Sequence, residues 1–271
     1  MLSTLQSKKG VSSLKKDELL VKIIPDRIEM GRVAADDATE KIIQLLEKQD
    51  EINMIFAAAP SQNEFIADLI SRPGIDWSRI NAFHMDEYIG IDPEAPQAFG
   101  KFLKDRIFGK VPFKKVFYLN GMAADLEAEC ERYSALLKKY PVDIVCLGIG
   151  ENGHIAFNDP GVADFNDDKL VKIIDLDLVS RQQQVNDKCF EFLHEVPTQA
   201  LTLTIPAMLK GKYLFCIVPA TNKAKAVYNT LNGEISEDCP ATILRTKKNV
   251  ILYLDEASSA LLNIQKNGHE E

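Results

Sequence analysis

The chain has 271 residues, of which 46% are hydrophobic and 27% are charged, and this balance is typical of a globular protein rather than a disordered one. Its formal net charge of −8 disfavours non-specific binding to nucleic acid or to an anionic membrane, because both are negatively charged. No apolar run approaches the ~20 residues of a membrane span, and no apolar signal segment follows Met1.

The five cysteines are an odd number, and no two of them form a C-x-x-C pair. This spacing indicates free thiols in a reducing compartment. We therefore expect a cytoplasmic protein.

Strands and helices are expected to alternate along the chain. Residues 1–17 are polar and rich in Ser and Lys, which predicts a flexible N-terminal extension, and a single α/β domain is expected over 18–271. In chain order, the elements expected in the first half are strand 19–24, helix 26–49, strand 52–59, helix 64–71 and strand 80–84.

The same alternation continues in the second half. The elements expected there are strand 115–119, helix 123–140, strands 142–148, 171–174, 200–205 and 213–219, helix 222–231, strand 250–254 and a final helix. The pattern predicts a doubly wound α/β fold with a mostly parallel sheet and helices on both faces, similar to a Rossmann fold. Ligands of such sheets bind at the carboxyl ends of the strands.

The segment NAFHMDEY places two adjacent carboxylates, Asp86 and Glu87, at the end of a predicted strand. Two adjacent acids are often only an exposed turn. A carboxylate in a partly dry cleft, however, has a raised proton affinity and can act as a general base.

A Gly-rich loop, LGIGENGHIAFNDPG, follows the predicted strand 142–148. Its glycines, Gly153 among them, permit a tight turn and a close approach of ligand to backbone. The loop leads into an Asn-Asp-Pro turn and not into a helix, and it has no GK[ST], so neither a dinucleotide nor a Walker A site is indicated. His154 within it is suited to move a proton. No second His or Cys has the spacing of a zinc site.

Two further segments could bind an anion. Lys223, in VPATNKA, stands at a predicted helix start, where a cation opposes the helix dipole unless an anion also binds there. The turn APSQNE offers hydroxyl and amide donors from Ser61, Gln62 and Asn63.

Together these motifs resemble the glucosamine-6-phosphate deaminase/isomerase family, in order and from about Leu19 to Leu262. FHMDEYIGI and LGIGENGHIAFNDPG are similar to the family patterns FNMDEYVGL and LGxGxDGHIAFNEPG. The resemblance implies conversion of an amino-sugar 6-phosphate to fructose 6-phosphate and ammonia, without a metal or organic cofactor. The partner that the resemblance implies is a small sugar phosphate. Both a monomer and a homo-oligomer are compatible with the family.

The resemblance also implies roles for single residues. Asp86 would take the proton from C2, with Glu87 beside it, and His154 would move a proton at the ring oxygen. Asp159 stands where the family has a Glu that supports this histidine. Lys223 stands where the family has a phosphate-binding lysine, and Ser61 and its neighbours fall in the phosphate loop.

The chain departs from the family pattern at several positions. Asn152 replaces the family's Asp, and we expect this amide to favour a neutral His154, because a carboxylate stabilises an imidazolium better. The turn from Pro60 replaces a Gly-Gly loop. The family's phosphate-binding arginine has no clean counterpart, and Arg181 or Lys188 is expected in its place.

Three alternatives stay open on the sequence. The substrate could be another amino-sugar phosphate such as galactosamine 6-phosphate. A 6-phosphogluconolactonase-like hydrolase shares the Gly-x-Gly-x-x-Gly-His loop. A non-catalytic sugar-phosphate sensor is the third alternative, to which Asn152 points.

Overall fold

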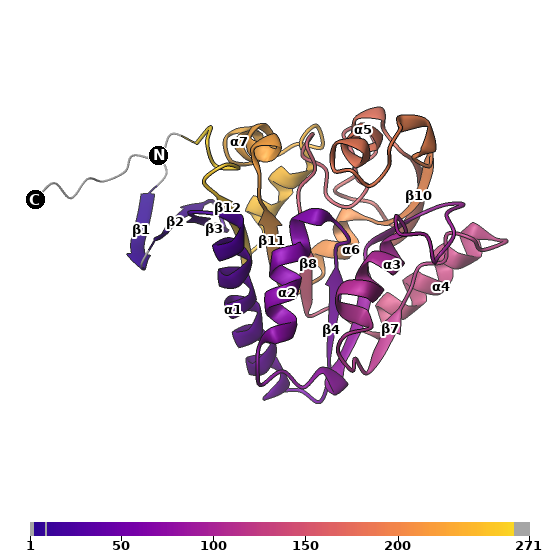
Figure 1. Ribbon diagram of the computed structural model, residues 1–271, viewed down its shortest axis with the longest axis horizontal. Helices are drawn as coiled ribbons and strands as arrows, with labels where there is room; N and C mark the ends of the chain where they lie inside the picture. Colours follow the sequence, from indigo (N-terminus) through magenta and orange to yellow (C-terminus); the bar gives the residue numbers. More distant parts are fainter. Residues whose placement is uncertain (1–2, 9, 263–271) are drawn as a thin grey trace, which may run out of the picture.

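The computed structural model describes residues 3–8 and 10–262, and its centre is a nine-stranded sheet (Figure 1). From β3 to β7 every neighbouring pair of strands is parallel, whereas β1 and β2 are antiparallel. The predicted, mostly parallel sheet is therefore confirmed. In sheet order the strands are β1 (Ser3–Lys8), β2 (Val11–Lys16), β3 (Leu19–Ile24), β12 (Val250–Asp255), β11 (Tyr213–Val218), β8 (Ile144–Leu147), β4 (Ile52–Phe56), β5 (Ile80–His84) and β7 (Lys115–Phe117).

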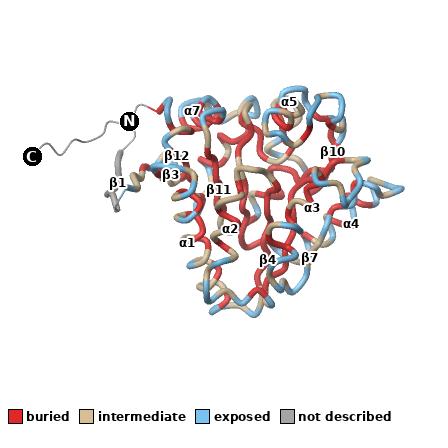
Figure 2. Tube along the Cα trace, viewed as in Figure 1, coloured by how far each residue is buried: buried red, intermediate tan, exposed pale blue. Residues whose placement is uncertain are grey.

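Helices cover both faces of this sheet, as the alternation predicts. Successive side chains of a strand point to opposite faces. Accordingly Met54 of β4 packs in one apolar core with Met30, while Ile55 packs in a second core with Tyr133. The sheet interior is buried from both sides (Figure 2). The helices of the first core are α1 (Arg27–Leu46), α2 (Asn63–Ser71) and α3 (Phe99–Leu103), and those of the second are α4 (Leu126–Lys139), α6 (Ile205–Leu209) and α7 (Ala224–Asn232).

A second, three-stranded antiparallel sheet has the order β6-β10-β9. It consists of β6 (Asp86–Tyr88), β10 (Gln199–Leu203) and β9 (Val171–Asp175). The strands expected at 171–174 and 200–205 therefore exist, but they pair with each other outside the main sheet, and β10 also pairs with the DEY segment.

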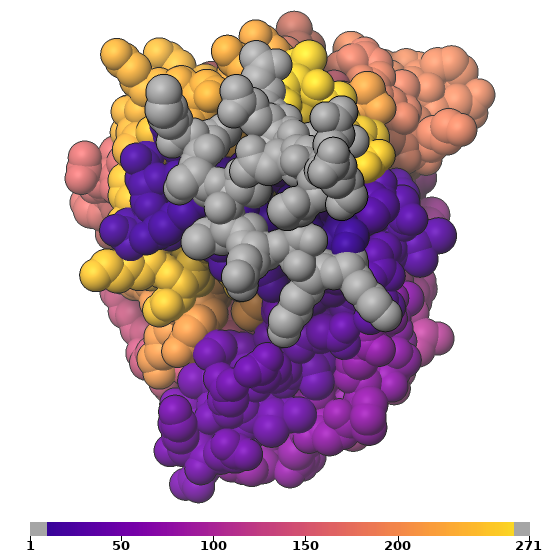
Figure 3. Space-filling view, turned by 90° about the vertical axis from the view of Figure 1, so that its left-hand side faces the viewer, coloured from indigo at the N-terminus to yellow at the C-terminus, as the bar shows by residue number. Residues whose placement is uncertain are grey.

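The two ends of the described chain differ from the sequence expectation. Residues Val11–Lys16, expected within a flexible extension, form β2, which pairs antiparallel with β3 and buries Leu14. Figure 3 shows this edge, where indigo N-terminal residues lie beside yellow C-terminal ones, in keeping with the β3–β12 pair. Residues 256–262 form turns where a final helix was expected, and the rest of that segment lies outside the described residues. In the described part of the chain no helix is both long and apolar enough to cross a membrane.

The close packing of α1 on α2 generates a stability prediction. A methyl group on Gly31 of α1 would lie 2.7 Å from Cβ of Glu64 and 2.8 Å from the amide nitrogen of Phe65, both in α2. We expect Gly31→Ala to lower the free energy of unfolding by about 1–3 kcal/mol, because α2 must shift. Denaturant unfolding measures this, with Glu40→Ala at an exposed position of α1 as control. A loss no greater than that of the control would contradict the close contact.

Candidate active site

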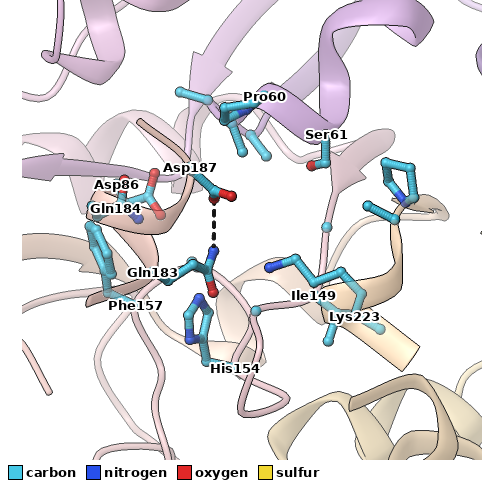
Figure 4. Close-up of a pocket in the computed structure, with 18 of the residues that line it drawn as sticks. Pro60, Ser61, Asp86, Ile149, His154, Phe157, Gln183, Gln184, Asp187 and Lys223 are labelled. Carbon is cyan, nitrogen blue, oxygen red and sulfur yellow. Dashed lines mark hydrogen bonds between the residues drawn. The ribbon is translucent and has the colours of Figure 1, made fainter. Parts of the chain in front are cut away.

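One cavity lies beyond the carboxyl ends of β4, β5, β8 and β11, where the predicted motifs begin. Helix α5 (Leu178–Asn186), which the sequence did not predict, contributes a further part of the wall. The structure brings Ser61, Asp86, His154 and Lys223 together around this cavity (Figure 4). The parallel sheet explains the meeting, since its strands end at one edge.

Asp86 is 7% exposed and lines a cavity whose walls are partly apolar. Two of these walls are the stacked rings of Phe99 and Phe157, whose centroids are 5.6 Å apart. Burial, and secondarily the charge of Glu87, raises the pKa of Asp86 well above its usual value. A carboxylate of raised proton affinity is a suitable general base near neutral pH.

His84 fixes the backbone of Asp86, a role the sequence did not predict. The amide of Leu119 donates to its Nε2 at 3.0 Å, so the proton is on Nδ1, which donates to the carbonyl of Asp86 at 2.9 Å. Burial lowers the pKa of His84 to about 4, with the Asp86 carbonyl and the charge of Glu129 opposing. The ring is therefore neutral at physiological pH, as this pair of hydrogen bonds requires.

Glu87 does not line the cavity, contrary to the expectation that it shares in catalysis. Its carboxylate accepts hydrogen bonds from the backbone amides of Tyr88, Phe99 and Gly100 at 2.8–3.0 Å. Burial raises the pKa of Glu87, with these three amides opposing. The residue thus holds the start of α3, and with it Phe99, beside Asp86.

His154 belongs to a buried cluster with Asp159 and Ser180. Its Nδ1 lies 2.8 Å from Oδ1 of Asp159 and 2.9 Å from the hydroxyl of Ser180, which itself donates to Asp159. Burial tends to raise the pKa of Asp159, but hydrogen bonds from His154, Asn152 and Ser180 and the histidine charge together lower it. Asp159 is therefore ionised, Nδ1 bears a proton, and Nε2 is the ring nitrogen left for a ligand.

Asn152 contacts this cluster but not the imidazole ring. Its amide donates to Oδ1 of Asp159 at 2.8 Å, and its oxygen accepts from the backbone amide of His154 at 3.1 Å. The expected influence on His154 therefore passes through Asp159. An amide suits this place because it can donate to a carboxylate, which another carboxylate cannot.

Two glycines shape the loop around His154. A methyl group on Gly150 would lie 2.2 Å from Nε2 of His154, so the ring occupies the space that a side chain would need. Gly153, expected to bind substrate, does not line the cavity; it has φ +89° and packs against Cys239. Both therefore place the histidine.

The small sheet connects Asp86 to the loop that contains His154. Thr202 of β10 pairs with Asp86 of β6, and its hydroxyl accepts from the amide of Phe157 at 3.1 Å. The amide group of Asn158 donates to the carbonyl of Leu203 at 2.8 Å. The positions of the proposed base and the histidine are thus tied to one strand.

Two cationic side chains, those of Lys223 and Arg27, line the other end of the cavity. Lys223 is 6% exposed and directly precedes α7. Burial lowers the pKa of Lys223, while the charges of Asp187 and Glu151 oppose this. The turn before it is held by Asp255, whose carboxylate accepts from the amide of Ala220 at 3.1 Å, and Ala220 has the unusual φ of 82°. Such strained residues concentrate at ligand sites.

Arg27 is a second cation of this end, and the sequence did not identify it. It is the first residue of α1, lines the cavity, and donates to the carbonyl of Pro60 at 3.1 Å and to Glu64 at 2.8 Å. The signal was weak, because Arg27 lies far in sequence from the motifs and its place depends on the packing of α1 on α2.

Of the turn residues expected to bind substrate, Ser61 lines the cavity but Gln62 and Asn63 do not. The amide of Gln62 points into the protein, toward the carbonyls of Leu147 and Ile217 at 3.3–3.4 Å. Asn63 accepts from Nε of Arg106 at 2.7 Å. Both side chains are therefore used to anchor the turn.

Neither proposed substitute for the family's arginine lines the cavity. Arg181 donates to the carbonyls of Leu193 and Val196 at 2.9 and 2.8 Å, so it fixes the chain after α5. Lys188 is exposed and has φ 60°. At the end of α5 it is Asp187, together with Gln183 and Gln184, that lines the cavity.

No group of three or more His, Cys, Asp or Glu side chains in the described ranges could hold a metal ion.

Comparison with known proteins shows what this chain is similar to. Residues 25–253 match the family model described as glucosamine-6-phosphate isomerases/6-phosphogluconolactonase. A glucosamine-6-phosphate deaminase of Bacillus cereus (strain B4264) is 36% identical over 83% of this chain and 84% of its own. One of Streptococcus sanguinis (strain SK36) is 34% identical over 88% and 97%.

Solved structures show the same fold. A monomeric glucosamine-6-phosphate deaminase superposes with a TM-score of 0.81 and 29% identity, over 89% of this chain and 99% of its own. A 6-phosphogluconolactonase of Thermotoga maritima has a TM-score of 0.72 at 20% identity, over 88% and 99%, and at that identity the likeness concerns the fold alone. On the family match and these relatives, the chain belongs to the glucosamine-6-phosphate isomerase/6-phosphogluconolactonase family.

Proposed function

We propose that the protein converts an amino-sugar 6-phosphate, in the first place glucosamine 6-phosphate, to fructose 6-phosphate and ammonia. The observation that supports this most is one cavity with a buried carboxylate, Asp86, a proton-moving His154, and cations at its other end. The relatives named above are glucosamine-6-phosphate deaminases, and this chain matches them over most of their length. The five free thiols accord with the cytoplasm as its compartment.

Different residues act in the successive steps of this reaction. His154 moves a proton between the C1 hydroxyl and the ring oxygen, which opens the ring. Asp86 then removes the proton from C2, and its return at C1 gives the 2-imine. Water hydrolyses this imine to the ketone of fructose 6-phosphate and releases ammonia. Lys223, Arg27 and the amides of the turn at Ser61 bind the phosphate at C6.

The role of Asp86 gives the first functional prediction. Asp86→Asn is expected to lower turnover by about 10²-fold or more, because the general base is lost. It should also raise the Tm at neutral pH. The folded chain binds the Asp86 proton more tightly than the unfolded chain does, so ionisation of this residue reduces stability as pH rises above about 3.9. An asparagine has no such ionisation.

Ammonia release and thermal unfolding test this prediction together. Asp168→Asn, at an exposed position, is the matched control and should change neither. Near-normal ammonia release by Asp86→Asn would exclude Asp86 as the base. Hydrolysis of 6-phosphogluconolactone by the wild type, with no ammonia from any amino-sugar phosphate, would overturn the proposed function.

The role of Lys223 is tested by phosphate binding. Lys223→Ala should weaken binding of inorganic phosphate by about 10-fold or more, since a charged hydrogen bond is worth about 1.5–3 kcal/mol. Lys188→Ala removes the same charge outside the cavity and should leave the affinity unchanged. Calorimetric titration measures both. Equal affinities of the two variants would show that Lys223 does not bind the phosphate.

Asn152→Asp tests the coupling of residue 152 to the histidine cluster. The new carboxylate would face Oδ1 of Asp159, so we expect a loss of about 1–3 kcal/mol in the free energy of unfolding. The added negative charge favours a protonated His154, so the alkaline limb of kcat/KM should move to higher pH. Asn166→Asp, in an exposed loop, is the control. An unmoved alkaline limb would show that the histidine does not respond to charge at residue 152.

A further inference from the structure

Asp187 lines the cavity, yet the reaction above gives it no task. It directly follows α5, where the chain turns at Lys188 with φ 60°, so that Lys188 is exposed and Asp187 is not. Figure 4 shows its carboxylate in the cavity, between Asp86 on one side and Ser61 and Lys223 on the other.

The charge of Asp187 is unfavourable for a pocket that binds phosphate alone. A carboxylate repels a phosphate dianion. The negative charges of Asp187 and Glu151 also act on Lys223, and they offset part of the positive charge that it presents to a phosphate. Burial raises the pKa of Asp187, with Lys223 and Gln183 opposing, and the charge of Glu151 adds to the rise. The carboxylate has one weak side-chain contact, from the amide of Gln183 at 3.4 Å. It is therefore well placed to accept further hydrogen bonds.

The proposed function indicates which part of the ligand meets this carboxylate. In the proposed function, the phosphate on C6 lies at Lys223 and Ser61, and C2 lies at Asp86. The carbons between these two ends are C3, C4 and C5, and in the closed sugar C3 and C4 bear free hydroxyls. The amine, on C2, belongs to the Asp86 end.

We infer that Asp187 is a specificity-determining residue that accepts hydrogen bonds from the C3 and C4 hydroxyls of the sugar phosphate. This inference rests on the proposed function, because that function sets the direction of the sugar in the cavity. C4 is the carbon at which glucosamine and galactosamine differ, so a single acceptor there discriminates between the two sugars. A site that hydrogen-bonds a hydroxyl rejects analogues without it, because its own polar group is then left unpaired.

Binding of ligands that cannot react separates this inference from turnover. The probes are inorganic phosphate, 2-amino-2-deoxyglucitol 6-phosphate, and the same alditol without its C3 and C4 hydroxyls. Asp187→Asn and Asp187→Ala should weaken binding of the full alditol by about 10- to 100-fold, as expected for a charged hydrogen bond. Both variants should bind inorganic phosphate as well as the wild type or better, because a repelling charge is gone. The deoxygenated alditol should lose little.

Glu191→Gln is the matched control, since it removes one exposed negative charge four residues further along the chain. It should leave all three affinities unchanged. Retained phosphate binding shows that the Asp187 variants are folded. The inference is overturned if the full alditol binds the variants as tightly as the wild type, or does not bind the wild type at all. Equal losses on both alditols would overturn it too, because Asp187 would then contact the amine or the phosphate end.

Ammonia release completes the test. The ratio of kcat/KM for glucosamine 6-phosphate to that for galactosamine 6-phosphate should move toward one in Asp187→Asn, and an unchanged ratio would contradict discrimination at C4. If the wild type binds the full alditol but releases no ammonia from either sugar, the proposed function fails. The binding measurements still decide the part played by Asp187 in that case.

Discussion

The site depends on the parallel pairing of β4, β5, β8 and β11, because this pairing ends four strands at one edge of the sheet. One feature of the site follows each of these strands directly: the turn at Ser61, the proposed base Asp86, the loop of His154 and the turn before Lys223. The small antiparallel sheet adds a second constraint. Thr202 of β10 pairs with Asp86 and also accepts a hydrogen bond from Phe157, so the proposed base and the histidine loop are positioned by the same strand.

The electrostatics of the cavity follow from how each charge is held. Asp159 and Glu87 accept several hydrogen bonds, and these oppose the effect of burial on their proton affinity. Asp86 shares the cavity wall with the rings of Phe99 and Phe157, and burial keeps its proton affinity high. The two adjacent acids therefore have different surroundings: Glu87 accepts from amides at the start of α3, and Asp86 lines the cavity. A buried carboxylate at Asp86 lowers stability, and the same raised proton affinity suits the base that we propose it to be.

Much of the fold could be predicted from the sequence, because apolar periodicity reports directly on buried strands and helix faces. The helices at α1, α2, α4 and α7 and the parallel strands were all indicated in this way. β2 was missed because its single buried side chain, Leu14, leaves almost no pattern among Ser and Lys. The short α3 and the polar α5 were missed because neither shows the apolar stripe of a longer helix.

Site residues within the motifs were predictable, since a strand end followed by an acid or by a Gly-rich loop already fixes their place. Whether a neighbour faces the cavity was not. Gln62 and Glu87 have suitable chemistry but point toward backbone groups, and sequence spacing does not reveal such partners. Arg27, Ser180 and Asp187 reach the site from α1 and α5, whose positions depend on packing between distant segments.

The central claim is that an amino-sugar phosphate loses its C2 proton in this cavity before its amine leaves. Single-turnover release of ammonia from glucosamine 6-phosphate with either hydrogen or deuterium at C2 tests it most directly. The account predicts that the wild type releases ammonia from both, and more slowly from the deuterated sugar, because the C2–H bond breaks before the amine leaves. Equal rates for the two sugars, or no ammonia from either, would contradict it.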